Sequence, residues 1–332
     1  MNPDFDGKRI FITGGTGFVG SLVLRRLKEA SKLSKSGISA TVLSRNPDAF
    51  QKSRPELVWP GLHFLKGDIG NFRLDPADRF DAVLHAGNPA SVASSKSDIR
   101  EFFRTTVAGT ENLLKEIGRL EKPPARLLLT SSGAVYQTRV PSEEPIPESA
   151  PTGKLGVYSE AKLAAEVAVK KFAGERQIGL TIGRIFACGG PYLPLAGRFA
   201  LGQFIRSARD SGEIVVRSEG LALRSYLAGD EVAGWLLTLL GQPGQSTEAF
   251  NVGSDDAIRI REVAETVQGV FAKRGKKIAL RFEPPADAPP PDHYLPDVRL
   301  IAEKLGLKPI KSSTQSIEET TEWALNEAGS IA

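Results

Sequence analysis

A glycine-rich segment near the start of the chain constrains the fold more than any other feature. Thr13–Gly20 (TGGTGFVG) lies between a short apolar run and an amphipathic stretch. In a strand, glycine turn and helix of this kind, backbone N–H groups at the start of the helix bind a pyrophosphate. Gly14 permits the tight turn, Gly17 lets the backbone approach a phosphate, and Gly20 lets the helix pack closely on the strand. The segment therefore predicts a dinucleotide site in a βαβ unit, with Thr16, Phe18 and Val19 completing the loop.

The first half of the chain continues this alternation of short apolar runs and amphipathic stretches. Several runs are apolar throughout, which indicates strands buried on both faces of a parallel sheet. The expected strands are Arg9–Thr13, Ala40–Ser44, His63–Lys66, Ala82–His85, Arg126–Ser131 and Leu180–Arg184. The expected helices are Phe18–Ser31, Ser97–Arg119 and Val157–Phe172. The pattern predicts an α/β fold, a Rossmann-type doubly wound parallel sheet.

The second half is less regular. We expect helices near Phe199–Ser211, Glu231–Leu240, Val298–Leu305 and Ser316–Ala328, and strands at Ile214–Arg217 and Ser225–Leu227. Glu283–Asp297 is too rich in proline to be helical. We predict a dinucleotide-binding domain of residues 1–187 plus about 224–253, and a smaller, discontinuous C-terminal substrate domain of residues 188–223 plus 254–332.

Composition excludes several other classes of protein. The chain has one cysteine, Cys188, and three scattered histidines, so neither a disulfide framework nor a metal site is expected. No apolar run reaches the ~18 residues that a membrane span needs. The net charge of +4 comes from basic residues spread along the chain, which does not favour nucleic-acid binding. We expect a soluble, cytoplasmic protein that acts on a small molecule.

The end of the second expected strand bears on the choice of cofactor. An enzyme that prefers NAD usually has an acidic residue there, which accepts hydrogen bonds from the ribose 2′-hydroxyl. Here the strand ends in Ser44 and Arg45, and the first acidic residue is Asp48. Because arginine and serine can bind a 2′-phosphate, we predict a preference for NADP over NAD. The alternative is that Arg45 is a surface residue that stacks on adenine.

Two residues on one helical face are candidates for proton transfer. Tyr158 and Lys162 are four residues apart at the start of an expected helix, and Ser132 follows an upstream strand. A nearby ammonium, together with an oxidised nicotinamide, would lower the pKa of the tyrosine so that it can accept a proton during hydride transfer. Taken alone, a Tyr-x-x-x-Lys pair is weak evidence. The pair gains weight from Ser132 and the glycine loop.

Together these motifs resemble the extended short-chain dehydrogenase/reductase family, in its branch of NAD(P)-dependent nucleotide-sugar epimerases and dehydratases. The resemblance covers nearly the whole chain. Further matching segments are Gly67–Ile69, Leu84–Gly87, Val107–Leu114, Gly190–Pro191, Arg224–Leu227, Phe250–Gly253, Pro296–Asp297 and Glu322–Trp323.

The resemblance implies a role for each matching residue. Ser132, Tyr158 and Lys162 would be catalytic, with Lys162 also bonded to the nicotinamide ribose. The remaining cofactor contacts would be Asp68 and Ile69 near the adenine, and Ala86 and Gly87 near the ribose and pyrophosphate. Ser132, Tyr158, Tyr192 and Arg224 would contact the substrate, Arg224 at the diphosphate. The alternative for Arg224 is a structural ion pair with Asp230 or Glu231.

Some positions depart from the family pattern. Thr106 and Ala187 stand where asparagine is usual, and Ser225 and Gln137 replace an acidic residue and a glycine. These changes leave the expected oxidoreductase core intact but weaken any prediction of the sugar. Cys188 is either a second acid–base group or, more simply, a small buried residue.

The departures also bear on the reaction. Dehydratases of the family carry Asp-Glu directly after the catalytic serine or threonine, whereas Gly133 and Ala134 cannot transfer protons. We therefore expect an NAD(P)-dependent oxidoreductase that acts on a nucleotide sugar at a carbon such as C4. It would be an epimerase or, nearly as well supported, a 4-ketoreductase of deoxysugar biosynthesis. A non-catalytic, NADP-binding redox sensor is the alternative of another class. By analogy with the family we expect a homodimer built on the helices at Ser97–Arg119 and Val157–Phe172.

Overall fold

The computed structural model describes residues 5–87, 96–137, 144–153, 156–197, 199–243, 247–287 and 290–329. The chain divides into two compact units. The first consists of Met1–Gln137, Thr152–Arg184 and Ala233–Phe250, and the second of Thr138–Pro151, Ile185–Val232 and Asn251–Ala332.

The first unit is built on a seven-stranded sheet with strand order β3-β2-β1-β4-β5-β6-β9. The strands are β1 (Arg9–Thr13), β2 (Ser39–Ser44), β3 (Leu62–Lys66), β4 (Ala82–His85), β5 (Arg126–Ser132), β6 (Gly179–Ile185) and β9 (Thr247–Val252). The pairs β1–β2, β1–β4, β2–β3 and β4–β5 are parallel. The strand order reverses direction at β1, so the crevice between the carboxyl ends of β1 and β4 is the expected place for a ligand.

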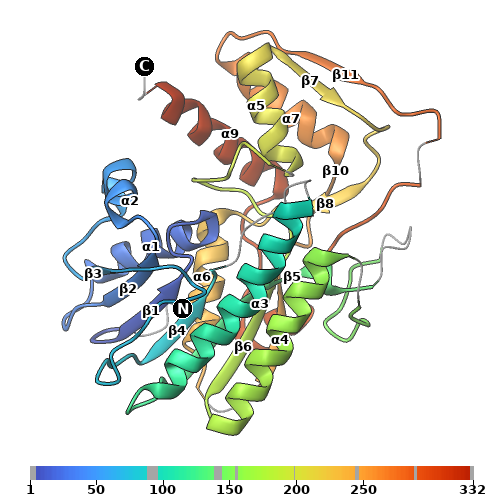
Figure 1. Cartoon of the computed structure of the whole chain (residues 1–332). Coiled ribbons are helices and arrows are strands. Elements are labelled where there is room, and N and C mark those ends of the chain that lie inside the picture. The colour runs from blue at the N-terminus through green and yellow to red at the C-terminus, as the bar shows by residue number, and fades with distance from the viewer. Residues whose placement is uncertain are drawn as a thin grey trace. The chain divides into compact units, whose positions relative to one another are not determined.

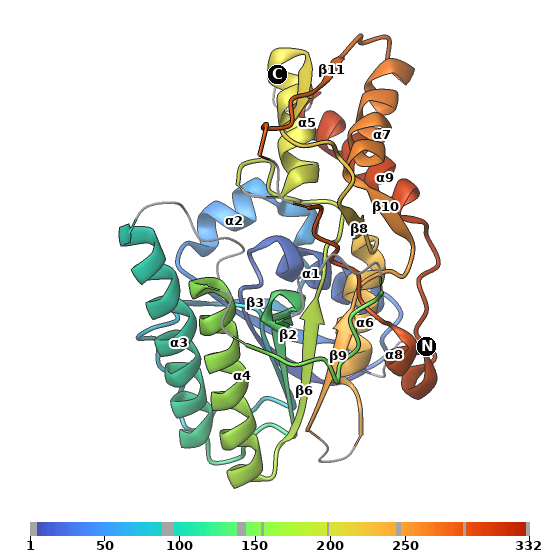
Figure 2. The same ribbon diagram turned by 90° about the vertical axis from the view of Figure 1, so that its right-hand side faces the viewer.

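Helices cover both faces of this sheet. Figure 2 shows α3 (Lys96–Arg119) and α4 (Val157–Arg176) on one face, and α1 (Phe18–Ser31) and α6 (Gly229–Leu240) on the other. The short helices are α2 (Pro47–Ser53) and the 3-10 turns Pro55–Leu57 and Gly133–Val135.

Alternation along the strands assigns side chains to the two faces. Phe11 of β1 and Val83 of β4 belong to one buried cluster with Leu113 and Ile117 of α3 and Val169 of α4. Adjacent residues of a strand point to opposite faces, so the neighbours of Phe11 on β1 face the other layer. Because both faces are buried, the strands are apolar throughout, as the sequence indicated.

The second unit contains two small sheets and four helices among its described residues. β7 (Glu213–Val216) pairs in parallel with β11 (Ala279–Phe282), and β8 (Leu223–Ser225) pairs antiparallel with β10 (Ala257–Arg259). The helices are α5 (Ala200–Ser211), α7 (Ile260–Lys273), α8 (Arg299–Leu305) and α9 (Ser313–Gly329), and Figure 1 shows α5 and α7 beside the β7–β11 pair.

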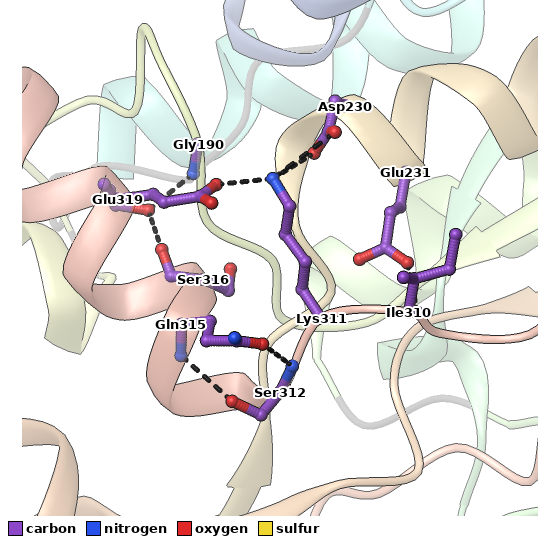
Figure 3. Close-up of polar contacts among 10 residues, drawn as sticks. Gly190, Asp230, Glu231, Ile310, Lys311, Ser312, Gln315, Ser316 and Glu319 are labelled. Carbon is purple, nitrogen blue, oxygen red and sulfur yellow. Dashed lines mark hydrogen bonds and ion pairs between the residues drawn. The ribbon is translucent and has the colours of Figure 1, made fainter.

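The start of α9 shows how this unit is held together (Figure 3). Ser312 and Gln315 form a capping box, in which each side chain accepts a hydrogen bond from the other residue's backbone N–H. Lys311 pairs with Glu319 at 2.8 Å and with Asp230 at 3.4 Å. These contacts tie the start of α9 to the start of α6.

The structure confirms the predicted fold class and most of the predicted elements. β1, β4 and α1 have the expected bounds, and most others differ by a few residues at their ends. The elements that sequence analysis did not predict are α2, β9, β10, α7 and β11. The described part of the proline-rich stretch 283–297 is free of helix, as expected. Among the described helices, none combines the length and apolarity that a membrane span requires.

Candidate active site

The glycine loop has room for backbone only. Gly14 has φ +72°, and a Cβ placed there would lie 2.2 Å from the Ala86 carbonyl oxygen at the end of β4. A Cβ on Gly20 would lie 2.1 Å from the Gly14 carbonyl oxygen. Gly17 is the N-cap residue of α1 and has no side-chain cap, so the first N–H groups of that helix point toward the loop. This backbone cradle with a positive helix end suits a pyrophosphate.

The other predicted cofactor residues follow the same carboxyl edge of the sheet. Ser44 is buried at the end of β2, and Arg45 beside it is exposed. The Gly87 N–H donates to Thr13 Oγ1 at 3.1 Å, which fixes the chain after β4 against the end of β1. Phe18 is buried, and Thr16 and Val19 are partly exposed.

Asp68 and Ile69 differ in how far they can contact a ligand. The Asp68 carboxylate accepts a hydrogen bond from the Gly70 N–H at 2.9 Å and is partly exposed. Ile69 is only 8% exposed and belongs to the core cluster under α3, where it packs against Gly109. Asp68 is therefore accessible to a ligand, whereas the Ile69 side chain packs mainly in the core.

The structure brings Ser132, Tyr158 and Lys162 together. The Ser132 hydroxyl hydrogen-bonds the Tyr158 hydroxyl and also accepts from the Ala134 N–H at 3.2 Å. Lys162 is 5% exposed, and its ammonium donates to the Thr130 carbonyl at 3.2 Å. Two residues at the end of β5 thus face the first turns of α4, as the sequence spacing predicts.

The pKa of Tyr158 reflects its burial. Burial raises it above 10.0, and the hydrogen bond from Ser132 opposes this shift only in part. Burial lowers the pKa of Lys162 to about 8, against an opposing effect of Glu166. A tyrosinate at neutral pH therefore requires a further positive charge near the ring.

His85, which the sequence analysis did not place in the site, links β4 to both neighbours. The Thr110 hydroxyl donates to the Thr106 carbonyl at 2.6 Å, so its oxygen accepts from His85 Nε2 at 2.9 Å. His85 Nδ1 must then accept from the Thr13 hydroxyl at 2.7 Å. Burial and the ammonium of Lys162 lower the pKa of His85 to about 3. The ring is therefore a neutral bridge between β1 and α3 and has no acid–base role.

Two aromatic or charged groups complete the surroundings of the catalytic pair. The Phe102 ring of α3 stacks on the Tyr158 ring, with centroids 5.2 Å apart and an interplanar angle of 25°. Glu166, one turn after Lys162, forms a buried ion pair with Arg184 of β6 at 2.8 Å. Sequence spacing alone shows that Glu166 shares a helical face with Lys162, but not that this face is buried.

The predicted substrate residues Tyr192 and Arg224 belong to the second unit. The Tyr192 ring packs edge-on against Trp323, with centroids 5.2 Å apart. The Arg224 guanidinium donates to the Asp292 carboxylate and carbonyl at 2.7 and 2.8 Å. Arg224 therefore forms an ion pair, but with Asp292 and not with Asp230 or Glu231.

Two of the positions that depart from the family pattern, Thr106 and Ser225, are buried. The Thr106 and Ser225 hydroxyls are fully buried, and neither has a hydrogen-bond partner among the described residues. Burial raises the pKa of Cys188 to about 12, so its thiol stays protonated at neutral pH and is a poor base. In the described part of the chain, no group of three or more His, Cys, Asp and Glu residues is placed to hold a metal ion.

Comparison with known proteins identifies the family. The family model of the NAD dependent epimerase/dehydratase family matches residues 10–253. The chain belongs to this family. The predictions of an enzyme of NAD-dependent epimerase/dehydratase type and of its fold are therefore confirmed.

The individual relatives share 28% sequence identity or less with this chain. The chain is 28% identical to UDP-glucuronic acid decarboxylase 3 of Arabidopsis thaliana, over 96% of its own length and 90% of that protein. It is 26% identical to UDP-glucuronic acid decarboxylase 1 of Danio rerio, over 96% and 73% of the two chains.

Solved structures share the fold. The UDP-glucose 4-epimerase of Thermotoga maritima, solved with UDP-glucose, matches with a TM-score of 0.80 at 22% identity, over 96% of this chain and 99% of the other. A dTDP-glucose 4,6-dehydratase of Bacillus anthracis, solved with NAD, matches with a TM-score of 0.74 at 18% identity, over 96% and 97% of the two chains.

Proposed function

We propose that this member of the NAD dependent epimerase/dehydratase family transfers hydride at C4 of a nucleotide sugar, with Ser132, Tyr158 and Lys162 handling the proton. The observation that carries the proposal is the hydrogen bond between the Ser132 and Tyr158 hydroxyls at the carboxyl end of β5, on the sheet edge that also carries the glycine loop. Oxidation of a sugar hydroxyl to a ketone removes a proton from the oxygen and a hydride from the carbon that bears it, so an enzyme needs a base and a hydride acceptor at one site.

The residues have distinct tasks in this scheme. Gly14, Gly17 and Gly20 would hold the pyrophosphate of a nicotinamide dinucleotide, which would supply the group that takes up and returns hydride. Tyr158 takes the proton from the sugar hydroxyl, and Ser132 donates a hydrogen bond to the oxygen from which the proton leaves. Since burial raises the pKa of Tyr158 in the free protein, deprotonation follows binding of the cationic oxidised cofactor.

The nucleotide and the sugar are inferred from the relatives. The curated relatives compared above are UDP-glucuronic acid decarboxylases, and one similar solved structure holds UDP-glucose. Arg224, already oriented by Asp292, offers a guanidinium that suits a diphosphate. We therefore expect a UDP-sugar as the first substrate to test.

The reaction that follows C4 oxidation depends on the sugar. Gly133 and Ala134 supply no proton donor or acceptor side chain after Ser132, which disfavours loss of water. Return of hydride to the opposite face gives an epimer, whereas a 4-ketoreductase would start from a 4-keto sugar and consume NADPH. A 4-keto uronic acid can also lose carbon dioxide, because its carboxylate is then β to a ketone. The decarboxylase relatives favour including this third outcome.

The experiment is a panel of UDP-glucose, UDP-N-acetylglucosamine, UDP-glucuronic acid and 4-keto sugars with NAD or NADP. Chromatography separates the epimers, and mass change and absorbance of the reduced cofactor are read with it for the wild type and Y158F. Turnover of one panel member that is lost in Y158F, with cofactor binding retained, supports the proposal. Equal turnover by wild type and Y158F contradicts the assignment of Tyr158.

We also propose a preference for NADP. No carboxylate follows β2 directly. β2 ends at Ser44, and the exposed Arg45 guanidinium beside it can face a 2′-phosphate at this sheet edge. R45A should weaken NADP binding about tenfold or more and leave NAD binding nearly unchanged, since a charge-assisted pair is worth about 1.5–3 kcal/mol. Fluorescence titration of both dinucleotides measures this. Tighter binding of NAD than of NADP by the wild type contradicts the preference.

A homodimer through α3 and α4 is the assembly that we propose. The two helices lie side by side on one face of the sheet (Figure 1) and carry the exposed apolar side chains Phe103 and Val167. Exposed apolar groups on adjacent helices suit a helix-to-helix interface. Light scattering should give a dimer, and F103E/V167E should give a monomer. A monomeric wild type contradicts this assignment.

A further inference from the structure

Glu166 is a buried charge that hydride transfer does not itself require. It lies one helical turn after Lys162 on α4, and it is 2% exposed. A carboxylate is seldom buried to this extent unless donors surround it, because loss of its hydration costs several kcal/mol.

Donors from two neighbouring strands surround the Glu166 carboxylate. Arg184 of β6 donates through Nε to Oε1 at 3.0 Å and through Nη2 to Oε2 at 2.8 Å. The Ser131 hydroxyl of β5 donates to Oε1 at 2.6 Å. Both carboxylate oxygens are therefore engaged, and the two-point contact with Arg184 fixes their orientation.

The same strand end also holds the lysine. Ser131 follows Thr130, whose carbonyl accepts the Lys162 ammonium, and precedes Ser132, which bonds the Tyr158 hydroxyl. Glu166 thus binds the middle residue of a three-residue segment whose other two members contact the catalytic pair. A shift of this segment relative to α4 would disturb both contacts.

We propose that Glu166 is a positioning residue: held by Arg184, it fixes this strand end to α4 and places a constant negative charge one helical turn from the Lys162 ammonium. Its importance for turnover rests on the proposed function. Its effect on the lysine is a property of the free protein and can be measured without substrate.

Several groups share the surroundings of Lys162. On its own helix are Tyr158 and Glu166, His85 faces it from β4, and Arg184 of β6 stands behind the carboxylate. At neutral pH His85 is uncharged, because burial lowers its pKa to about 3, and Tyr158 is protonated. Glu166 is therefore the charge that raises the pKa of Lys162, and the two cations paired with it, Arg184 at 2.8 Å and Lys170 at 3.9 Å, oppose its effect.

The opposite effects of these charges predict the direction in which each variant changes the pKa of Lys162. Burial lowers the pKa of Lys162 to about 8, and Glu166 raises it against that effect. Loss of the carboxylate charge in E166Q should lower the pKa further. Loss of the guanidinium in R184M should raise it, because Glu166 then keeps only the longer contact with the half-exposed Lys170 ammonium, at 3.9 Å, to offset its charge on Lys162.

The experiment follows the ¹³Cε resonance of Lys162 in lysine-labelled, cofactor-free protein as the pH is raised. The resonance that K162M lacks identifies the residue. We expect E166Q to move the pKa of Lys162 down, and R184M to move it up, each by about 0.5 or more. The double variant E166Q/R184M should return close to the wild-type value. E160Q, which removes a charge from the first turn of the same helix, is the matched control and should leave this pKa nearly unchanged.

Changes of the same sign in E166Q and R184M, or no change in either, would overturn the proposal and leave a purely structural ion pair. Should E166Q fail to fold because Arg184 is left buried and unpaired, R184M and the double variant still decide the sign. Failure of the UDP-sugar panel does not affect this titration, so the two proposals fail separately.

Discussion

Replacing Lys162 with methionine should change how the stability of the protein depends on pH. Methionine keeps much of the length of the side chain but carries no charge. In the folded protein the pKa of Lys162 is lowered from 10.5 to about 8 by burial. The unfolded chain therefore binds the proton more tightly, and the wild type gains stability as the pH rises between these two values.

The size of the effect follows from the two pKa values. A difference of one in pKa between the folded and unfolded states corresponds to about 1.36 kcal/mol. At pH 7 burial of the charged lysine therefore costs about 3 kcal/mol, and at pH 9.5 about 1.4 kcal/mol. Relative to K162M, the wild type should become more stable by about 2 kcal/mol over that interval. The lost hydrogen bond to the Thr130 carbonyl adds a contribution that does not vary with pH.

Urea unfolding of both proteins at several values between pH 7 and pH 9.5 measures this difference. All other titrating groups are common to the two chains, so the comparison isolates Lys162. A stability difference that stays constant within about 0.5 kcal/mol would refute the lowered pKa and the argument from burial on which it rests.

Further predictions concern the loop and the tyrosine. G20A should weaken dinucleotide binding at least about tenfold and lower the melting temperature, because the new Cβ would overlap loop backbone. The control G174A, on α4 with no atom within 4 Å of its Cβ, should have unchanged or higher stability. Equal dinucleotide binding by both variants would contradict the role of the glycine loop as a phosphate cradle. F102L should lower kcat several-fold at nearly constant KM, since an aromatic stack worth about 1 kcal/mol orients Tyr158. F103L, at an exposed neighbouring position, should change neither kcat nor KM. Steady-state kinetics with the substrate found in the panel measures both variants, and an equal loss of kcat in F102L and F103L would contradict the role of the stack.

The parts of the fold that sequence predicted well are those with strong local signals. Arg9–Thr13 and Phe18–Ser31 are strongly apolar or amphipathic, and glycines mark the boundary between them. By contrast, α7 was missed although Val263, Val267 and Val270 recur at helical spacing, because its surroundings gave no fold context. β9 was missed because a six-residue edge strand that starts with a threonine and a glutamate has a weak pattern.

The candidate site shows a similar division. Residue types at fixed spacing, such as Tyr158 and Lys162, can be recognised from the sequence alone. The contact between Glu166 and Arg184 depends on packing between a helix and a strand, and no local pattern encodes it. Burial, which raises the pKa of Tyr158, cannot be read from spacing, so the sequence indicated only the nearby charges that would lower it.

The central claim is that Tyr158 removes a proton while hydride leaves C4 of a nucleotide sugar. Single-turnover reaction of the UDP-sugar panel, with each sugar deuterated at C4, tests it most directly. We predict that, for the substrate, deuterium appears on the reduced cofactor with a primary isotope effect, and that Y158F binds the cofactor but transfers no deuterium. Turnover during which no deuterium appears on the cofactor at any time, or transfer that is unchanged in Y158F, would contradict the claim.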